Sequence, residues 1–257
     1  MITHADPPVG PVPPAPLVFP GAEPLTLQGE AVQLLPDPAL WWPAQHTLCV
    51  ADVHLGKAAT FRALGQPVPA GTTQDNLQRL DAALQRTGAR HLVLLGDLLH
   101  ARQAHNAALL TALHVWRQRH AQVRMTLVRG NHDDRAGDPP ATLDIAVVDE
   151  PWAIGPFAAC HHPRDDDTHH EGAAAGAHAG FILAGHTHPV CRLQGRGRDT
   201  VRLPCFVHSA GQLLLPAFGA FTGGCLIGPA PGVQRYPVGG GRVWRWPDDG
   251  ARFHPSG

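Results

Sequence analysis

Short apolar runs that end close to an acid or an amide restrict the fold of this 257-residue chain more than any other feature. The polar residues that follow them are Asp52, Asp97 and Asn131. The three runs are Thr47–Ala51, His91–Leu95 and Val123–Val128. Apolar runs of this length are typical of buried strands. The sequence therefore predicts three strands that carry polar side chains at their carboxyl ends.

The segments between these runs predict helices. Leucines recur at helical spacing within 72–87, where Thr72 or Thr73 offers an N-cap and Gly88 follows the last turn. The segment 106–120 has the same periodicity. Strands that alternate with helices form a mostly parallel sheet covered by helices.

The rest of the chain is less regular. A strand is expected at 31–35, a loop at Trp41–Trp42, and further strands at 158–160 and 181–184. Beyond Val201 helical periodicity stops, and short Gly-containing strands predict a second, antiparallel-rich sheet packed on the first. The expected fold class is α/β, a layered sandwich in one domain.

Residues 1–24 are rich in proline and are expected to form a flexible arm that lacks the features of a secretory signal. Residues 25–257 are expected to form the domain, with the metal-site core at about 47–210 and C-terminal strands within 211–250. No apolar run reaches the roughly 18 residues of a membrane helix, so no membrane partner is expected. Five widely spaced cysteines predict reduced, mostly buried thiols and a cytoplasmic location.

Histidine is unusually frequent: 18 residues, against 20 Lys and Arg together. Many of these histidines stand with Asp and Asn directly after the predicted strands. The strand-end set is Asp52, His54, Asp97, His100, Asn131, His132, His161, His162, His186 and His188. In open α/β sheets the carboxyl ends of the strands form one crevice, so these side chains should converge.

Asp, Asn and His ligands without a thiolate suit divalent ions such as Mn, with Fe or Zn as alternatives. The set exceeds what one octahedral ion needs, so two ions that share Asp97 as a bridge are expected. In an extended segment, residues i and i+2 point to one side, which lets Asp52 and His54 grip one ion together and lets His186 and His188 reach one site. Glycines before Asp97, Asn131 and His186 should permit close backbone approach. Paired metals activate water for the hydrolysis of phosphate esters.

Five motifs in this order resemble the calcineurin-like metallophosphoesterase superfamily. They are Asp52-x-His54, Gly96-Asp97-x-x-His100, Gly130-Asn131-His132-Asp133, His161 and Gly185-His186-x-His188. The resemblance implies a four-layer αββα sandwich, two packed mixed sheets flanked by helices. It implies that Asp52, His54, Asp97 and His188 hold one ion and that Asp97, Asn131, His161 and His186 hold the other.

In the same resemblance, Asp97 and His132 are the catalytic residues. His132 acts on the substrate phosphate as general acid or stabiliser of developing charge, turned by a neighbouring acid, and Asn131 also contacts substrate. The family pattern selects His161 as the ligand of the fourth motif, with His162 as the alternative. Arginines beside the site could contact flanking phosphates, and Arg62 is the one selected.

Two further regions resemble bacterial ligase-associated DNA damage response endonucleases of the PdeM type. They are Gly56–Arg62 with Pro67–Thr73, and Leu215–Gly219 with Phe221–Gly224. The resemblance implies a metal-dependent phosphodiesterase or endonuclease that acts on DNA, single-stranded or damaged, in DNA repair. It also implies functional partnership with an ATP-dependent DNA ligase, a helicase and an exonuclease.

Two alternatives remain at this point. One is a phosphatase or pyrophosphatase that acts on a nucleotide or nucleotide sugar, and the other is a non-catalytic scaffold. The net charge of −1 argues against strong autonomous binding of DNA, whose affinity for proteins comes largely from Lys and Arg. Delivery of the substrate by partner proteins would reconcile a neutral chain with a DNA substrate.

Overall fold

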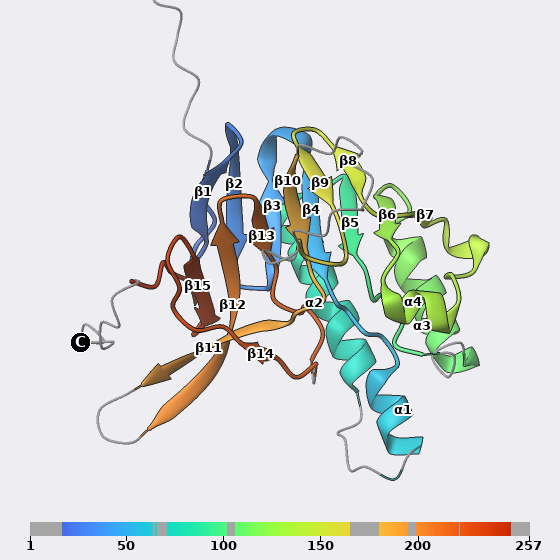
Figure 1. Cartoon of the computed structure of the whole chain (residues 1–257). Helices are drawn as coiled ribbons and strands as arrows, with labels where there is room; N and C mark the ends of the chain where they lie inside the picture. Colours follow the sequence, from blue (N-terminus) through green and yellow to red (C-terminus); the bar gives the residue numbers. More distant parts are fainter. Residues whose placement is uncertain are drawn as a thin grey trace, which may run out of the picture.

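Two β-sheets packed against each other form the framework of the protein (Figure 1). The structure is a computed structural model, and it describes residues 17–63, 65, 71–101, 106–164, 180–194, 199–220 and 222–247. The acidic segment Asp165–Glu171, for which the sequence favours a solvated loop over a further metal site, lies outside these residues. The sandwich of two mixed sheets confirms the predicted α/β class.

The first sheet has seven strands in the order β1 to β7. Strands β1 to β4 are antiparallel neighbours, and β4 to β7 are parallel. Their bounds are β1 Glu23–Leu27, β2 Glu30–Leu35, β3 Ala39–Trp42, β4 Thr47–Ala51, β5 His91–Leu95, β6 Arg124–Val128 and β7 Ala146–Val148. The three predicted apolar runs are thus the adjacent central strands β4, β5 and β6.

The helices of the described chain are α1 Lys57–Ala63, α2 Thr72–Thr87, α3 Ala107–Arg119 and α4 Asn131–Ala136, with 3-10 turns η1 Pro43–Gln45 and η3 Ala141–Leu143. Helix α2 confirms its predicted bounds, and Gly88 ends it in a left-handed conformation with its N–H bonded to the Leu84 carbonyl. The N-cap is Gly71, at φ 94°, and not Thr72 or Thr73, because both threonines already belong to the helix.

The second sheet runs in the order β14-β11-β12-β13-β10-β9-β8, and β15 pairs with β12 and β16. The bounds are β8 Trp152–Ile154, β9 Phe157–Ala159, β10 Phe181–Ala184, β11 Pro189–Gln194, β12 Thr200–Ser209, β13 Gln212–Leu214, β14 Cys225–Leu226, β15 Gln234–Gly239 and β16 Arg242–Val243. The second sheet was expected from the segment beyond Val201, and it also includes the strands predicted at 158–160 and 181–184. Strands β9 and β10 pair in parallel with each other inside the second sheet.

Three apolar clusters follow from this layering. Phe157, Phe181 and Phe206 belong to the cluster between the sheets, whereas Leu80 of α2 and Trp116 of α3 pack on the outer face of the first sheet. The outer face of the second sheet carries a third cluster that includes Trp246. Among the described residues, α2, α3 and α4 all contribute to the cluster on the first sheet, and none contributes to the cluster on the outer face of the second.

The expected loop at Trp41–Trp42 is part of strand β3. Trp41 packs toward the helices and Trp42 toward the second sheet, as successive residues of a strand do. The Trp42 indole also donates to Glu30 Oε2 at 2.8 Å. Both rings are therefore core residues.

The ordered fold begins before the end of the expected 1–24 arm. The Gln33 side chain donates to the Leu17 carbonyl at 2.8 Å and accepts from the Phe19 N–H at 3.0 Å, and β1 starts at Glu23. Residues 1–16 lie outside the described chain.

The prediction of mostly buried thiols is confirmed, since all five cysteines are free and only Cys225 is exposed. Within the described part of the chain, no helix has the length and apolarity that a bilayer span requires.

Candidate metal centre

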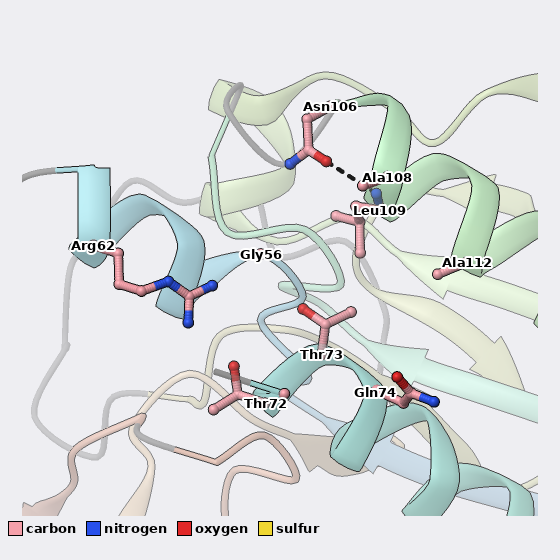
Figure 2. A pocket seen from close by; sticks show the side chains of 10 residues that line it. Gly56, Arg62, Thr72, Thr73, Gln74, Asn106, Ala108, Leu109 and Ala112 are labelled. Carbon is pink, nitrogen blue, oxygen red and sulfur yellow. Dashed lines mark hydrogen bonds between the residues drawn. The ribbon is translucent and has the colours of Figure 1, made fainter. Parts of the chain in front are cut away.

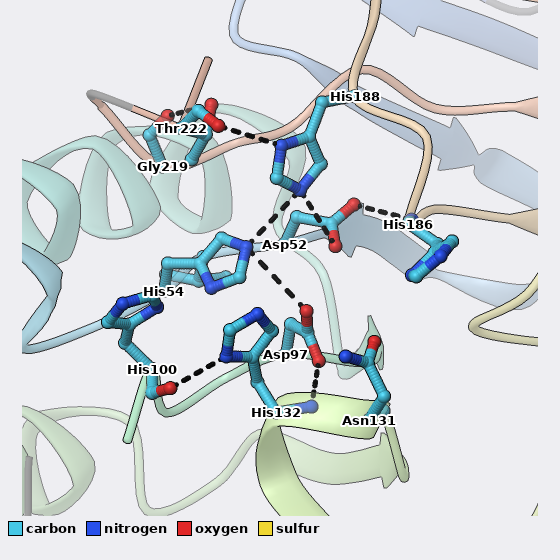
Figure 3. Close-up of polar contacts among 12 residues, drawn as sticks. Asp52, His54, Asp97, His100, Asn131, His132, His186, His188, Gly219 and Thr222 are labelled. Carbon is cyan, nitrogen blue, oxygen red and sulfur yellow. Dashed lines mark hydrogen bonds and ion pairs between the residues drawn. The ribbon is translucent and has the colours of Figure 1, made fainter. Parts of the chain in front are cut away.

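Loops from both sheets meet at one place, at the carboxyl ends of their parallel strands (Figure 3). From the first sheet, the loop after β4 carries Asp52 and His54, the loop after β5 carries Asp97, and the start of α4 carries Asn131 and His132. From the second sheet, the ends of β9 and β10 carry His161, His186 and His188. The structure thus brings together every predicted metal ligand.

The backbone at these positions is unusual. Of the eight non-glycine residues with positive φ among those described, five are predicted ligands: Asp52, His54, Asp97, His186 and His188. Such conformations cost free energy and cluster at functional sites. The expected extended geometry for Asp52 and His54 was therefore wrong. The two side chains converge because both residues adopt left-handed conformations around Val53.

The glycines of the motifs allow the loops to touch, as predicted. A Cβ atom at Gly96 would overlap the His161 ring, and one at Gly130 would overlap Asp97. A Cβ atom at Gly185 would lie 2.6 Å from Asp52 Oδ2. Each of these glycines therefore makes room for a predicted ligand from another loop.

We define the first subsite by Asp52, His54 and His188, whose ligand atoms all lie within 4.8 Å of one another. His188 Nε2 is 3.3 Å from Asp52 Oδ1 and 3.2 Å from His54 Nε2. His54 Nε2 is 3.6 Å from Asp97 Oδ2. Asp52, His54 and Asp97 are buried. Asp97 thus borders this subsite with one of its two carboxylate oxygens.

We define the second subsite by Asn131, His161 and His186. His161 Nε2 lies 2.9 Å from Asn131 Oδ1, 3.0 Å from His186 Nδ1 and 3.5 Å from Asp97 Oδ1. Asp97 therefore reaches the first subsite through Oδ2 and the second through Oδ1. This is the position that a bridging carboxylate would occupy.

Hydrogen bonds outside the cluster decide which ring nitrogens face it. His188 Nδ1 bonds to the Thr222 carbonyl at 3.0 Å, and His161 Nδ1 bonds to the Leu95 carbonyl at 3.2 Å. A carbonyl only accepts, so both Nδ1 atoms donate, and both Nε2 lone pairs face the cluster. Those lone pairs point at acceptor oxygens of Asp52 and Asn131, an arrangement that favours a cation between them. The donor set therefore fits two divalent metal ions.

The pKa shifts of the ligand histidines run in two directions. Burial opposes protonation of His188, but the Asp52 carboxylate outweighs burial and raises the pKa of His188. Burial, with Lys57 and the neighbouring histidines, lowers the pKa of His54. Burial and the rings of His161 and His162 lower the pKa of His186. His54 and His186 are thus neutral rings, the form that binds metal.

His132 stands beside both subsites. Its backbone N–H donates to Asp97 Oδ1 at 2.9 Å, and its ring Nδ1 donates to the His100 carbonyl at 2.8 Å. The expected acid that turns this ring is absent among the described residues. Asp133 instead accepts from the N–H groups of Leu99 and Gly130, because it caps the turn that begins α4.

His100 supports the site through stacking. Its ring lies parallel to His132 at a centroid distance of 4.8 Å, with Phe61 stacked at 6.0 Å. Burial, with His132 and Lys57, lowers the pKa of His100 to about 4, so the ring is neutral near pH 7.

The two candidates of the fourth motif differ in their surroundings. His161 is fully buried in the second subsite, whereas the His162 side chain is 46% exposed and its Nδ1 bonds to Glu150 Oε1. Glu150 Oε2 also accepts from the N–H groups of His161 and His162, at 2.6 and 2.9 Å. The geometry favours His161 as the ligand. Cys160, beside it, is buried with its pKa raised to about 11, which fits a structural thiol.

Arg62 is exposed in the last turn of α1 and lines a cavity of about 270 Å³ beside the first turns of α2 and α3 (Figure 2). Gly56, two residues after His54, lines the same cavity. Arg62 is therefore near the metal centre in sequence but belongs to a separate hollow, and its substrate contact stays a prediction.

Three groups that support the ligands were missed by sequence reasoning: Glu150 and the carbonyls of Leu95 and Thr222. Every residue has a backbone carbonyl, so the residue type does not indicate which carbonyls will support a ligand. Glu150 lies 11 residues before His161 and outside every motif. Only the folded geometry could reveal them.

Residues 46–190 match the family model described as "Calcineurin-like phosphoesterase", so the chain belongs to this family. It is a metal-dependent phosphoesterase. Among solved structures, it is similar to the Pseudomonas putida nuclease MPE, with 47% sequence identity and a TM-score of 0.73 over 88% of this chain and 100% of that one.

A second solved structure, the phosphoesterase Yfce from E. coli, is 17% identical, with a TM-score of 0.37 over 76% of this chain and 88% of that one. That similarity is too distant to support any conclusion about this chain. A comparison with curated proteins finds no match.

Proposed function

We propose that the chain hydrolyses phosphodiester bonds in DNA with two divalent metal ions, Mn first among the candidates, as part of DNA repair in the cytoplasm. The 47% identity to a nuclease supports a nucleic acid substrate. The resemblance to ligase-associated endonucleases supports action on single-stranded or damaged DNA beside an ATP-dependent ligase, a helicase and an exonuclease.

The observation that carries the proposal is the arrangement of acceptor atoms around Asp97. Its two oxygens border two groups of imidazoles, and in each group the Nδ1 atom of one ring, His188 or His161, is held by a backbone carbonyl. Two divalent ions in such a site supply the charge that activates water and neutralises the scissile phosphate. Asp52, His54, Asp97 and His188 would hold one ion, and Asp97, Asn131, His161 and His186 the other.

The chain's own residues then orient and protonate the substrate. His132 is fixed by its bond to the His100 carbonyl, so its Nε2 is the atom free to serve the leaving oxygen. Asn131, at the same end of α4, lies next to the position where a phosphate oxygen would sit. Arg62 would contact a phosphate farther along the strand.

Asp97→Ala should lower DNA cleavage by about 10³-fold or more, because a bridging ligand supports several kcal/mol of transition-state stabilisation and each 1.36 kcal/mol is tenfold. His132→Ala should lower the rate by about 10²-fold to 10⁴-fold while Mn²⁺ binding is retained. Both are measured on single-stranded DNA under saturating Mn²⁺. Wild-type rates in either variant would contradict the proposal.

The substrate class is tested by comparing turnover of single-stranded DNA with that of mononucleotides and nucleotide sugars. Higher kcat/KM on DNA is expected. The absence of DNA cleavage at saturating Mn²⁺, with rapid release of phosphate from mononucleotides, would favour the phosphatase alternative.

A further inference from the structure

Asn76 is a buried polar residue on the face of α2 that packs against the first sheet, 3% exposed. Its side chain makes two bonds to backbone segments far apart in the sequence. Nδ2 donates to the Val53 carbonyl at 3.2 Å, and Oδ1 accepts from the Ala220 N–H at 3.2 Å. One amide thus joins two loops, and neither loop belongs to α2.

The first of these loops carries ligands of the first subsite. Val53 lies between Asp52 and His54, both in left-handed conformations. The loop touches the second one directly, since the Gly219 N–H donates to the Asp52 carbonyl at 3.0 Å. A Cβ atom at Gly219 would overlap the Val53 carbonyl, so the two backbones pack without space between them.

The second loop, described at residues 217–220 and 222–224, orients the remaining ligand of that subsite. The Thr222 carbonyl accepts from His188 Nδ1 at 3.0 Å and from Lys57 Nζ at 3.3 Å. The first of these bonds directs His188 Nε2 toward Asp52. The Arg79 guanidinium, one turn after Asn76, donates to the Phe218 carbonyl at 2.7 Å and anchors the same loop to α2.

We propose that Asn76 is a positioning residue for the first metal subsite. It holds the Asp52–His54 segment against the second loop, and through Thr222 it fixes the ring of His188. This inference rests on the proposed two-metal function. The bonds of Asn76 reach neither the loop of Asn131 nor that of His161. Its one link to the second subsite runs through Asp52 Oδ2, which accepts from the His186 N–H at 2.9 Å, so the second subsite should depend on it far less.

The amide is required because one partner is an acceptor and the other a donor. Alanine removes both bonds and leaves the buried Val53 carbonyl and Ala220 N–H unpaired. Aspartate keeps the acceptor for Ala220 but turns a carboxylate oxygen toward the Val53 carbonyl. Serine removes part of the reach but leaves a hydroxyl that can both donate and accept.

The test is Mn²⁺ binding to the full chain. Electron paramagnetic resonance measures the binding, and metal analysis after dialysis counts the bound ions. The wild type should bind two ions. Asn76→Ala and Asn76→Asp should weaken the binding of one ion by about 10-fold to 100-fold, as the loss of supporting hydrogen bonds does, and weaken the binding of the other far less. Thr87→Ala is the matched control, because Thr87 is buried on the same helix and bonds only within it.

The tautomer of the His188 ring provides a second measurement, because a purely structural role of Asn76 would leave it unchanged. In the metal-free wild type, ¹⁵N chemical shifts should show His188 protonated at Nδ1, and Asn76→Ala should populate the other tautomer while Thr87→Ala does not. Should Asn76→Ala fail to fold, Asn76→Ser replaces it in both measurements.

Two ions bound at unchanged affinity by every Asn76 variant would overturn the inference, as would equal weakening of both ions. A wild type that binds no Mn²⁺ would overturn the proposed function and the inference with it. A wild type with two ions and an insensitive Asn76 would overturn the inference alone.

Discussion

The two proposed metal subsites differ in where their support comes from. In the second subsite, His161 is held by the Leu95 carbonyl and by Glu150, both inside residues 46–190, the region that matches the family. In the first subsite, His188 is held by the Thr222 carbonyl, 32 residues beyond the end of that region. The ligands of both subsites lie in shared motifs, but only the second is supported by the shared region alone. The first subsite needs a loop that the C-terminal part of the chain supplies.

The largest expected effect comes from breaking the second subsite at its centre. His161→Ala should leave the chain with one bound Mn²⁺ instead of two and lower phosphodiester hydrolysis by about 10³-fold, on the same free-energy scale as loss of Asp97. Metal analysis and kcat/KM on single-stranded DNA measure the two effects. His162→Ala is the control, since that ring is half-exposed and should leave both quantities near wild type. If His162→Ala lost Mn²⁺ and activity while His161→Ala did not, His162 would be the ligand.

A smaller effect is expected from the support of that subsite. Glu150→Gln keeps the shape of the side chain but removes the charge that accepts from the N–H groups of His161 and His162. We expect Mn²⁺ at the second subsite to bind about 10-fold to 100-fold more weakly, with the first subsite unchanged. Isothermal titration resolves the two steps. Glu30→Gln, which perturbs a carboxylate bonded to Trp42, should change neither step, and a loss in the first step of Glu150→Gln would contradict the comparison.

The smallest expected effect concerns the stability of the fold at a position away from the proposed metal site. His91 lies at the start of β5, at the opposite end from Asp97, and burial together with Arg124 lowers its pKa to about 4. The unfolded chain, with a histidine pKa near 6.5, binds this proton more readily, so the stabilisation is present above about pH 6.5 and is lost as pH falls toward 4.

Chemical denaturation of the metal-free chain at pH 7, 6, 5 and 4 measures this dependence. The free energy of unfolding should fall less steeply in His91→Gln than in wild type, by at most about 1.4 kcal/mol per pH unit. Parallel curves for the two proteins would show that His91 does not remain neutral in the fold.

Local patterns predicted the elements that carry most ligands. The strands before Asp52 and Asp97 and the helix 72–87 have the predicted bounds, because apolar runs and helical spacing depend on near neighbours. By contrast, nothing in the apolar runs at 158–160 and 181–184 indicates that these strands join the second sheet. Which sheet a strand joins is decided by pairing with distant strands, and an apolar run alone does not encode that choice.

The ligand set could likewise be predicted, whereas its supports could not. The predicted ligands all lie in sequence motifs, and the structure brings them together as expected. They are Asp52, His54, Asp97, Asn131, His161, His186 and His188. The Thr222 carbonyl acts through its backbone, which any residue offers, and Asn76 acts from the middle of a helix whose periodicity describes only its apolar face. Contacts of this kind appear only once distant segments have been folded together.

The left-handed backbone at five ligand positions sets stability against function. Each such residue costs on the order of 1–3 kcal/mol, and together they approach the 5–15 kcal/mol that separates a typical folded domain from its unfolded chain. The surrounding sheets must supply that difference in every molecule, with or without metal. Glycine at any of these positions would relieve the strain and remove a ligand in the same step. Stability gained at these positions would therefore be accompanied by a loss of activity.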